Sequence, residues 1–96
     1  MADVFLRAAG TRAEQKLHDR GLEHLHVRVY GKHLIIHSGT PDDPENRARL
    51  TQLGSDRYRL DMAARSRWET TPYMGTMVEL LAQLIDDFGF LLVPWS

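Results

Sequence analysis

Cysteine is absent from this sequence, proline is scarce, and the positive and negative charges nearly cancel. The absence of cysteine excludes a disulfide framework and thiolate chemistry, and it is typical of a reducing compartment. No apolar run approaches the roughly 18 residues of a membrane-spanning helix, and the N-terminal residues lack the basic start and long apolar region of a signal peptide. We therefore expect a cytoplasmic protein that has no membrane partner.

Several signatures of catalysis are also absent. The sequence has no glycine-rich phosphate loop, no nucleophile elbow, no closely spaced cysteine pair and no paired-carboxylate signature. Its acidic clusters, at 42–45 and 86–87, are typical of a solvated loop and a solvated helix face. We therefore predict no cofactor, and we expect a binding protein rather than an enzyme.

The apolar content of the sequence is sufficient for one small domain that spans residues 1–96. Of the 96 residues, 43% are apolar, which allows a core to form but leaves little stability to spare in a chain of this length. No internal repeat, low-complexity tract or linker divides the chain.

The strongest local pattern lies between Thr76 and Gly89. Thr76 and Glu79 have the spacing of a capping box, in which each side chain satisfies a free backbone amide at the start of a helix. Gly89 suits the left-handed position just beyond a helix end. At 100° per residue the apolar side chains fall within an arc of roughly 160°, so we predict an amphipathic helix that covers another apolar surface. These apolar residues are Met77, Val78, Leu80, Leu81, Leu84, Ile85 and Phe88.

Residues 24–38 have the alternating pattern of a β-hairpin. Apolar and polar side chains alternate on both sides of Gly31 and Lys32, which suit a two-residue turn with glycine at its first position. This register places His26 opposite His37 and puts the apolar residues of both strands on one face.

Residues 46–64 read as a second hairpin, with a three-residue loop at 54–56. In this register Arg49 lies opposite Asp61 on the polar face. The connection between the two hairpins, 39–45, holds two prolines and three acidic residues, and we predict that it is the most mobile loop.

The two ends of the chain give weaker signals. Residues 3–20 predict a helix in one or two pieces, because Gly10 weakens its middle. Residues 65–75 lead into the C-terminal helix. The apolar run Phe90–Val93 is either a fifth strand or an apolar tail along the sheet. The apolar stripe of the N-terminal helix is thin and consists of Phe5, Ala9, Ala13 and Leu17, with Leu6 as a further candidate.

These elements together predict an α+β fold. We expect a four-stranded antiparallel sheet built from two hairpins, with one face covered by the C-terminal amphipathic helix and the N-terminal helix at the side or edge. A fifth strand at Phe90–Val93 would extend that sheet. The pattern leaves open whether both hairpins belong to one sheet.

Arginine is concentrated in the middle of the chain. The sequence has ten arginines and two lysines, and six of the arginines lie between residues 47 and 67. If both hairpins share one sheet, its uncovered face carries arginine and tyrosine side chains suited to a phosphate backbone or an acidic protein. The simpler interpretation is that any open antiparallel face is polar. The candidate residues of this cationic face are Arg28, Tyr30, Arg47, Arg49, Arg57 and Arg59.

The histidines of the first hairpin form a candidate metal site. His26 lies opposite His37, and His24 lies diagonal to His37 on the same face, so one metal ion could reach all three imidazoles. Ordinary surface histidines or a pH-sensitive contact would give the same pattern. The sequence reveals no acidic partner for such a site, and Arg28 would oppose a cation there.

Aromatic side chains near loops and chain ends form a candidate interface, which comprises Trp68, Tyr73, Phe90 and Trp95. An open sheet also leaves edges with which another copy can pair. We therefore predict a small interaction module that binds another protein or a second copy of itself. The alternative is a nucleic-acid-binding protein or small ribonuclease, with histidine as acid or base and arginine holding the phosphate.

Overall fold

The fold was derived from a computed structural model, which describes residues 2–40 and 42–94. An N-terminal helix is followed by five strands, a second helix and a short 3₁₀ helix. Their bounds are α1 (Ala2–Asp19), β1 (His26–Tyr30), β2 (His33–Thr40), β3 (Asp43–Gly54), β4 (Arg57–Ala64), β5 (Arg67–Gly75), α2 (Met77–Asp87) and η1 (Gly89–Leu91).

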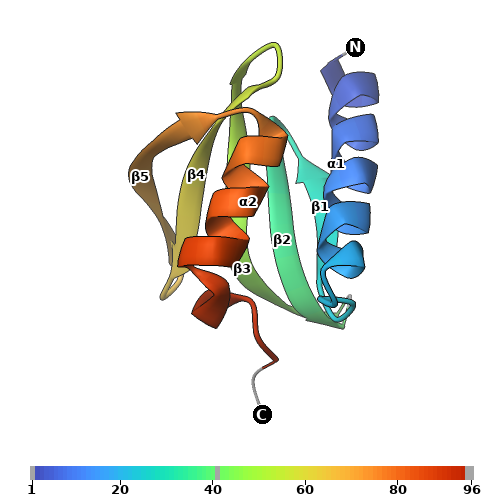
Figure 1. The fold of residues 1–96 in the computed structure, drawn as a ribbon, viewed down its shortest axis with the longest axis vertical. Helices are drawn as coiled ribbons and strands as arrows, with labels where there is room; N and C mark the ends of the chain where they lie inside the picture. The colour runs from blue at the N-terminus through green and yellow to red at the C-terminus, as the bar shows by residue number, and fades with distance from the viewer. Residues whose placement is uncertain (1, 41, 95–96) are drawn as a thin grey trace.

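The five strands form one antiparallel sheet in the order β1-β2-β3-β4-β5. Figure 1 shows both helices on the same side of this sheet, with α2 across its middle and α1 alongside β1. The predicted α+β class is confirmed, and the two hairpins belong to a single sheet. In the described part of the chain, no helix is long and apolar enough to cross a membrane.

Both predicted hairpin registers are confirmed. His26 pairs with His37, and Gly31 takes the positive φ of 58° that favours glycine in the β1–β2 turn. Arg49 pairs with Asp61 in the second hairpin. Its turn is shorter than predicted because Gly54 already pairs with Arg57 after a register shift, yet the pairing beyond the shift is unchanged.

The predicted loop at 39–45 is wrong, because the described residues of this segment are mostly strand, whereas its mobility stays a prediction. Strands β2 and β3 continue into this segment, where Gly39 pairs with Pro44 and Thr40 with Asp43. Proline is tolerated there because β4 pairs with β3 only from Ala48 onward, so this end of β3 needs hydrogen bonds on one side only.

The fifth strand lies before α2, at Arg67–Gly75, and not at Phe90–Val93. Pro72 made this segment look like a connection, but β5 is an edge strand, where a missing amide donor does little harm. The pairing shifts between Thr70 and Met74, and the Thr71 hydroxyl donates to the Leu60 carbonyl across this shift, 2.7 Å away. The Thr71 side chain thus replaces a backbone hydrogen bond that the pairing of β4 with β5 lacks at this point.

The two ends of α2 differ in how well the sequence predicted them. The capping box is present: the Glu79 amide donates to Thr76 Oγ1 at 3.1 Å, and the Thr76 amide donates to Glu79 Oε1 at 2.9 Å. At the other end Gly89 does not take the predicted left-handed conformation. Instead it begins η1, so the apolar run that follows is folded as a 3₁₀ turn rather than as a strand.

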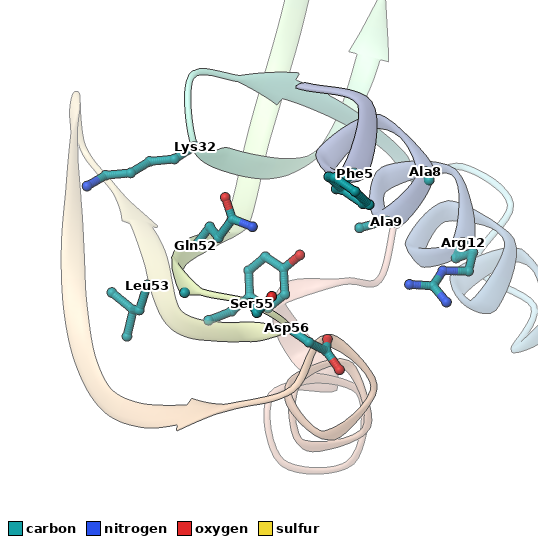
Figure 2. A pocket seen from close by; sticks show the side chains of 11 residues that line it. Phe5, Ala8, Ala9, Arg12, Lys32, Gln52, Leu53, Ser55 and Asp56 are labelled. Carbon is teal, nitrogen blue, oxygen red and sulfur yellow. The ribbon is translucent and has the colours of Figure 1, made fainter. Parts of the chain in front are cut away.

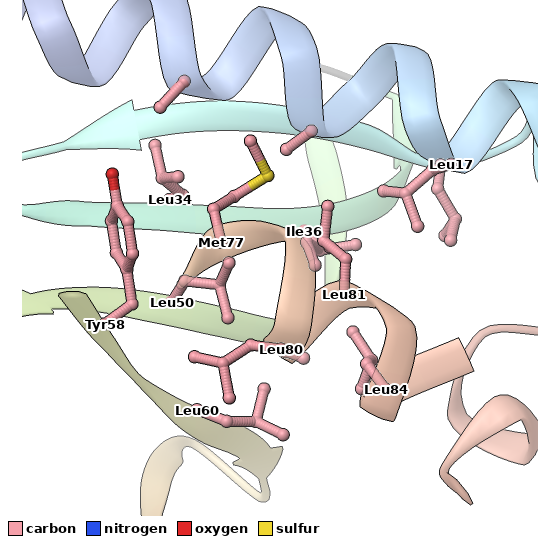
Figure 3. Close-up of a cluster of buried hydrophobic side chains, with 14 of the residues drawn as sticks. Leu17, Leu34, Ile36, Leu50, Tyr58, Leu60, Met77, Leu80, Leu81 and Leu84 are labelled. Carbon is pink, nitrogen blue, oxygen red and sulfur yellow. The ribbon is translucent and has the colours of Figure 1, made fainter. Parts of the chain in front are cut away.

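The core lies between the sheet and the two helices, and Figure 3 shows side chains from the sheet and from both helices meeting there. Four residues of α2 are buried, whereas Val78 is 52% exposed. The residues of the central strands that meet them are Leu34, Ile36, Leu50, Tyr58 and Leu60.

Helix α1 is continuous and approaches the sheet closely. A methyl group added at Gly10 would lie 3.4 Å from the Val29 side chain, which is close to van der Waals contact, so the helix backbone at this position lies against β1. Phe5, predicted to face the core, is instead 77% exposed. The buried stripe, at helical spacing, consists of Leu6, Ala9, Ala13 and Leu17.

We expect Leu80→Ala to lower the free energy of unfolding by about 2–5 kcal/mol, because it removes a buried side chain and leaves a cavity under α2. The matched control is Val78→Ala in the same helix, which should change the free energy by less than about 0.5 kcal/mol because Val78 is exposed. Chemical denaturation followed by circular dichroism measures both, and equal effects would contradict this assignment of the helix faces.

Candidate functional site

The face of the sheet opposite the helices is organised around Asp61, which is completely buried. Its carboxylate accepts hydrogen bonds from Arg49 Nε and Arg59 Nε, both at 2.8 Å, and from the Thr51 hydroxyl at 2.7 Å. His33 Nδ1 lies 2.9 Å from the same hydroxyl and extends this polar network. The network neutralises one carboxylate with two guanidinium groups, so it leaves one excess positive charge.

The hydrogen bonds to Asp61 decide its protonation. Burial alone would raise the pKa of this carboxyl group, but the hydrogen bonds from Arg59, Arg49 and Thr51 outweigh burial and hold the pKa below its usual value. Asp61 is therefore ionised near neutral pH, and it serves to fix the two arginines rather than to transfer protons.

Most arginines of the predicted cationic face already form hydrogen bonds with other side chains or with the backbone. Arg49 and Arg59 are bound to Asp61, and Arg28 donates to Asn46 Oδ1 at 3.1 Å. Tyr30 and Arg57 are exposed near the two hairpin turns. The outer face is thus a network of paired charges rather than an open row of arginines.

Arg47 does not lie on the outer face, contrary to the prediction. The register shifts between Ile36 and His37, which leaves Arg47 as an extra residue in β3 and turns its side chain toward the helix side. It is 3% exposed and donates to the Ser38 hydroxyl and to the carbonyls of Leu91 and Val93. Arg47 therefore holds the segment after α2.

His24 has a similar structural role and is not part of the predicted histidine face. It precedes β1, and its Nε2 lies 2.5 Å from the Leu92 carbonyl, which can only accept a hydrogen bond. Arg47 and His24 together thus bind three consecutive carbonyls of the C-terminal segment, at 91–93.

The other two predicted histidines do lie together. The rings of His26 and His37 are 5.9 Å apart, and the His18 ring lies 6.0 Å from that of His26 on its other side. The pKa of His37 is lowered by burial and then by the positive charge of Arg28, which favours a neutral imidazole. Sequence reasoning missed His18 and its helical neighbour Glu14, because only the packing of α1 against β1 brings them to the hairpin.

Two of the predicted interface residues, Tyr73 and Phe90, are exposed and are joined by the half-buried Phe88. The Tyr73 ring lies 5.8 Å from that of Phe88, which lies 6.3 Å from that of Phe90. Trp68 is separate, and its ring packs under the Arg49 guanidinium at 4.6 Å. Trp95 lies outside the described residues. We refer to Tyr73, Phe88 and Phe90 as the aromatic strip.

A cleft of about 690 Å³ lies between the N-terminal half of α1 and the β3–β4 hairpin. Figure 2 shows Phe5 and Arg12 from the helix on one side, with Leu53 from the hairpin on the other. The hydroxyl of Tyr58, which also lines the cleft, has a raised pKa because of burial and the nearby charge of Asp56, so it stays protonated. The cleft combines apolar walls with the charged side chains of Arg12, Lys32 and Asp56.

Comparisons of this chain with protein-family models, with curated proteins and with solved structures found no match.

We expect Asp61→Asn to lower the free energy of unfolding at about pH 7 by about 2–3 kcal/mol, because the two arginines lose a buried anionic partner. Since folding lowers the pKa of Asp61, its stabilising effect is complete above the unfolded pKa of about 3.9 and is lost as the pH falls through the folded pKa. The variant should therefore lose less stability than the native protein on acidification to about pH 3.

The matched control for this prediction is Asp86→Asn, since Asp86 pairs with Arg20 at 3.6 Å with both side chains more than half exposed. Its effect at about pH 7 should not exceed about 0.5 kcal/mol. Urea denaturation at both pH values measures all three proteins, and identical pH profiles for the native protein and the Asp61→Asn variant would contradict the assigned role of Asp61.

Proposed function

We propose that this protein is a cytoplasmic interaction module that works by pairing with a second copy of itself along β5. The observation that carries the proposal is the difference between the two edges of the sheet. The lack of cysteine supports the compartment, since it is typical of proteins in a reducing environment.

The edge at β1 is closed by α1. The Glu14 carboxylate, from the middle of the helix, accepts a hydrogen bond from the Val27 backbone amide at 2.8 Å. The helix therefore uses up a backbone donor that an incoming strand would need, and it occupies the space beside β1 (Figure 1).

The edge at β5 is open. Among the described residues β5 pairs only with β4, and neither helix runs alongside it (Figure 1). The irregular stretch around Pro72 limits the longest uninterrupted run of pairing in β5 to Arg67–Thr70, and pairing resumes at Met74 and Gly75. An open edge of this kind accepts another strand, and the short regular segment limits how many backbone hydrogen bonds can form.

The charges on β5 favour a second copy as the partner. An antiparallel pairing of two β5 strands centred on Trp68 places Arg67 of each copy opposite Glu69 of the other. Both residues are exposed and form no ion pair among the described residues. This two-fold arrangement closes on itself and therefore gives a dimer rather than a filament.

The aromatic strip adds apolar surface beside this edge. It begins on β5 with Tyr73, which is 37% exposed, and ends with Phe90, which is 67% exposed. Adjacent exposed aromatics are typical of the apolar centre of an interface, and they would supply association energy that four paired residues alone do not.

We expect the native protein to dimerise with a dissociation constant in roughly the micromolar range. Glu69→Arg places an arginine opposite Arg67 of the other copy at two symmetric positions. The repulsion should raise the dissociation constant by about tenfold or more. The double variant Arg67→Glu/Glu69→Arg restores opposite charges and should recover dimerisation. Sedimentation velocity over a series of concentrations measures all three.

The control is Glu23→Arg, which makes the same charge change at an exposed residue far from β5 in the sequence and should leave the dimerisation constant unchanged. A native protein that stays monomeric at all concentrations would sink the proposal. So would a Glu69→Arg variant that dimerises like the native protein.

Nucleic-acid binding or RNA cleavage through the outer face stays a prediction from the sequence. Arg49 and Arg59 already donate to Asp61, so a phosphate group on that face would compete with this carboxylate for them.

A further inference from the structure

Glu14, His18 and His26 converge where α1 lies against the start of β1. Glu14 and His18 are four residues apart in the helix and therefore share one face of it. His26 is the first residue of β1. One ligand atom from each of the three side chains lies within 4.8 Å of the other two.

Two of these side chains are already held by backbone groups. The Val27 amide donates to Glu14 Oε1 at 2.8 Å, which fixes the carboxylate beside β1. His18 Nε2 lies 2.8 Å from the Leu25 carbonyl. Because a carbonyl can only accept, Nε2 carries the proton in the neutral imidazole, which leaves the lone pair of Nδ1 for a cation. Backbone hydrogen bonds of this kind orient the ligands of protein metal sites.

His26 links this pair to a further imidazole. Its Nδ1 lies 3.8 Å from Glu14 Oε1, and its side chain is 49% exposed, so the group is accessible from solvent. The ring of His37 lies 5.9 Å from that of His26. Nδ1 of His37 is buried and makes no hydrogen bond among the described residues. A buried polar atom without a partner is uncommon and calls for an explanation such as a bound ion or water.

We propose that Glu14, His18 and His26 bind a divalent cation of the zinc type, with the fourth position open on the side of His37. Imidazole nitrogen together with carboxylate oxygen suits zinc and its neighbours in the first transition series, whereas calcium and magnesium prefer sets of oxygen ligands. Two histidines and one glutamate are a ligand set that zinc uses when it keeps one position for water or another group.

The geometry requires only small side-chain rotations. In a tetrahedral site with bonds of about 2.1 Å, the ligand atoms stand about 3.4 Å apart. The three side chains therefore need to close by little more than an ångström from their present separations. Because two ligands come from α1 and one from β1, the bound cation joins the helix to the edge of the sheet.

Isothermal titration calorimetry with zinc chloride, in a buffer that does not chelate, tests the site. We expect one zinc ion per chain and no heat from magnesium. His26→Ala and Glu14→Gln should each weaken zinc binding by about tenfold or more. Glutamine retains an acceptor for the Val27 amide, so the second variant removes the charge with little change to the packing.

His24→Gln is the control, because His24 belongs to the group that the sequence alone suggested but binds the Leu92 carbonyl instead. This variant should bind zinc as the native protein does. A loss of affinity as large as that of His26→Ala would overturn the proposed ligand set, as would a native protein that binds no zinc.

A measurement on the native protein tests the site even if a variant does not fold. In proton NMR, zinc should shift the ring signals of His18 and His26 and leave those of His33, on the outer face, in place. Equal shifts for all histidines would mean only unspecific surface binding and would also overturn the proposal.

Discussion

The fold depends on one constraint, which is that the sheet has a single apolar face and must keep water away from it. Helix α2 covers the centre of that face with large side chains such as Leu80 and Leu84. Helix α1 covers the flank, where it buries Gly10 and two alanines and lies close to β1. This close approach has two further results: it closes one edge of the sheet, and it brings two helical side chains to a strand histidine.

The outer face of the sheet, opposite the helices, is stabilised by paired charges rather than by apolar packing. It is polar, as an uncovered face should be, but Asp61 and Thr51 at its centre are as inaccessible as the residues of the core. Asp61 is buried because Arg49 and Arg59 lie over it and Trp68 packs against Arg49. An excess of arginine in a sequence therefore says little about surface charge until the positions of the acidic partners are known. Here Asp61 alone pairs with two of the six arginines between residues 47 and 67.

The sequence predicted what depends on residues close together in the chain. The pairing of Arg49 with Asp61 and the capping box at Thr76 both follow from local spacing, and both are confirmed. The position of Arg47 could not be predicted. One extra residue in a strand turns a side chain to the other face of the sheet, and the residue types in the strand do not reveal where such an extra residue lies. The contact between His18 and His26 could not be predicted either, because no fixed spacing in the sequence indicates which helix residue packs against which strand residue.

The strand order has a consequence for how the chain folds. Every strand pairs with its neighbour in sequence, so each step of sheet formation closes only a short loop and costs little chain entropy. The contact between His24 and Leu92 is different, because it spans 68 residues. The N-terminal helix and the first hairpin can therefore form early and locally, whereas the C-terminal segment docks only once the sheet it rests against exists.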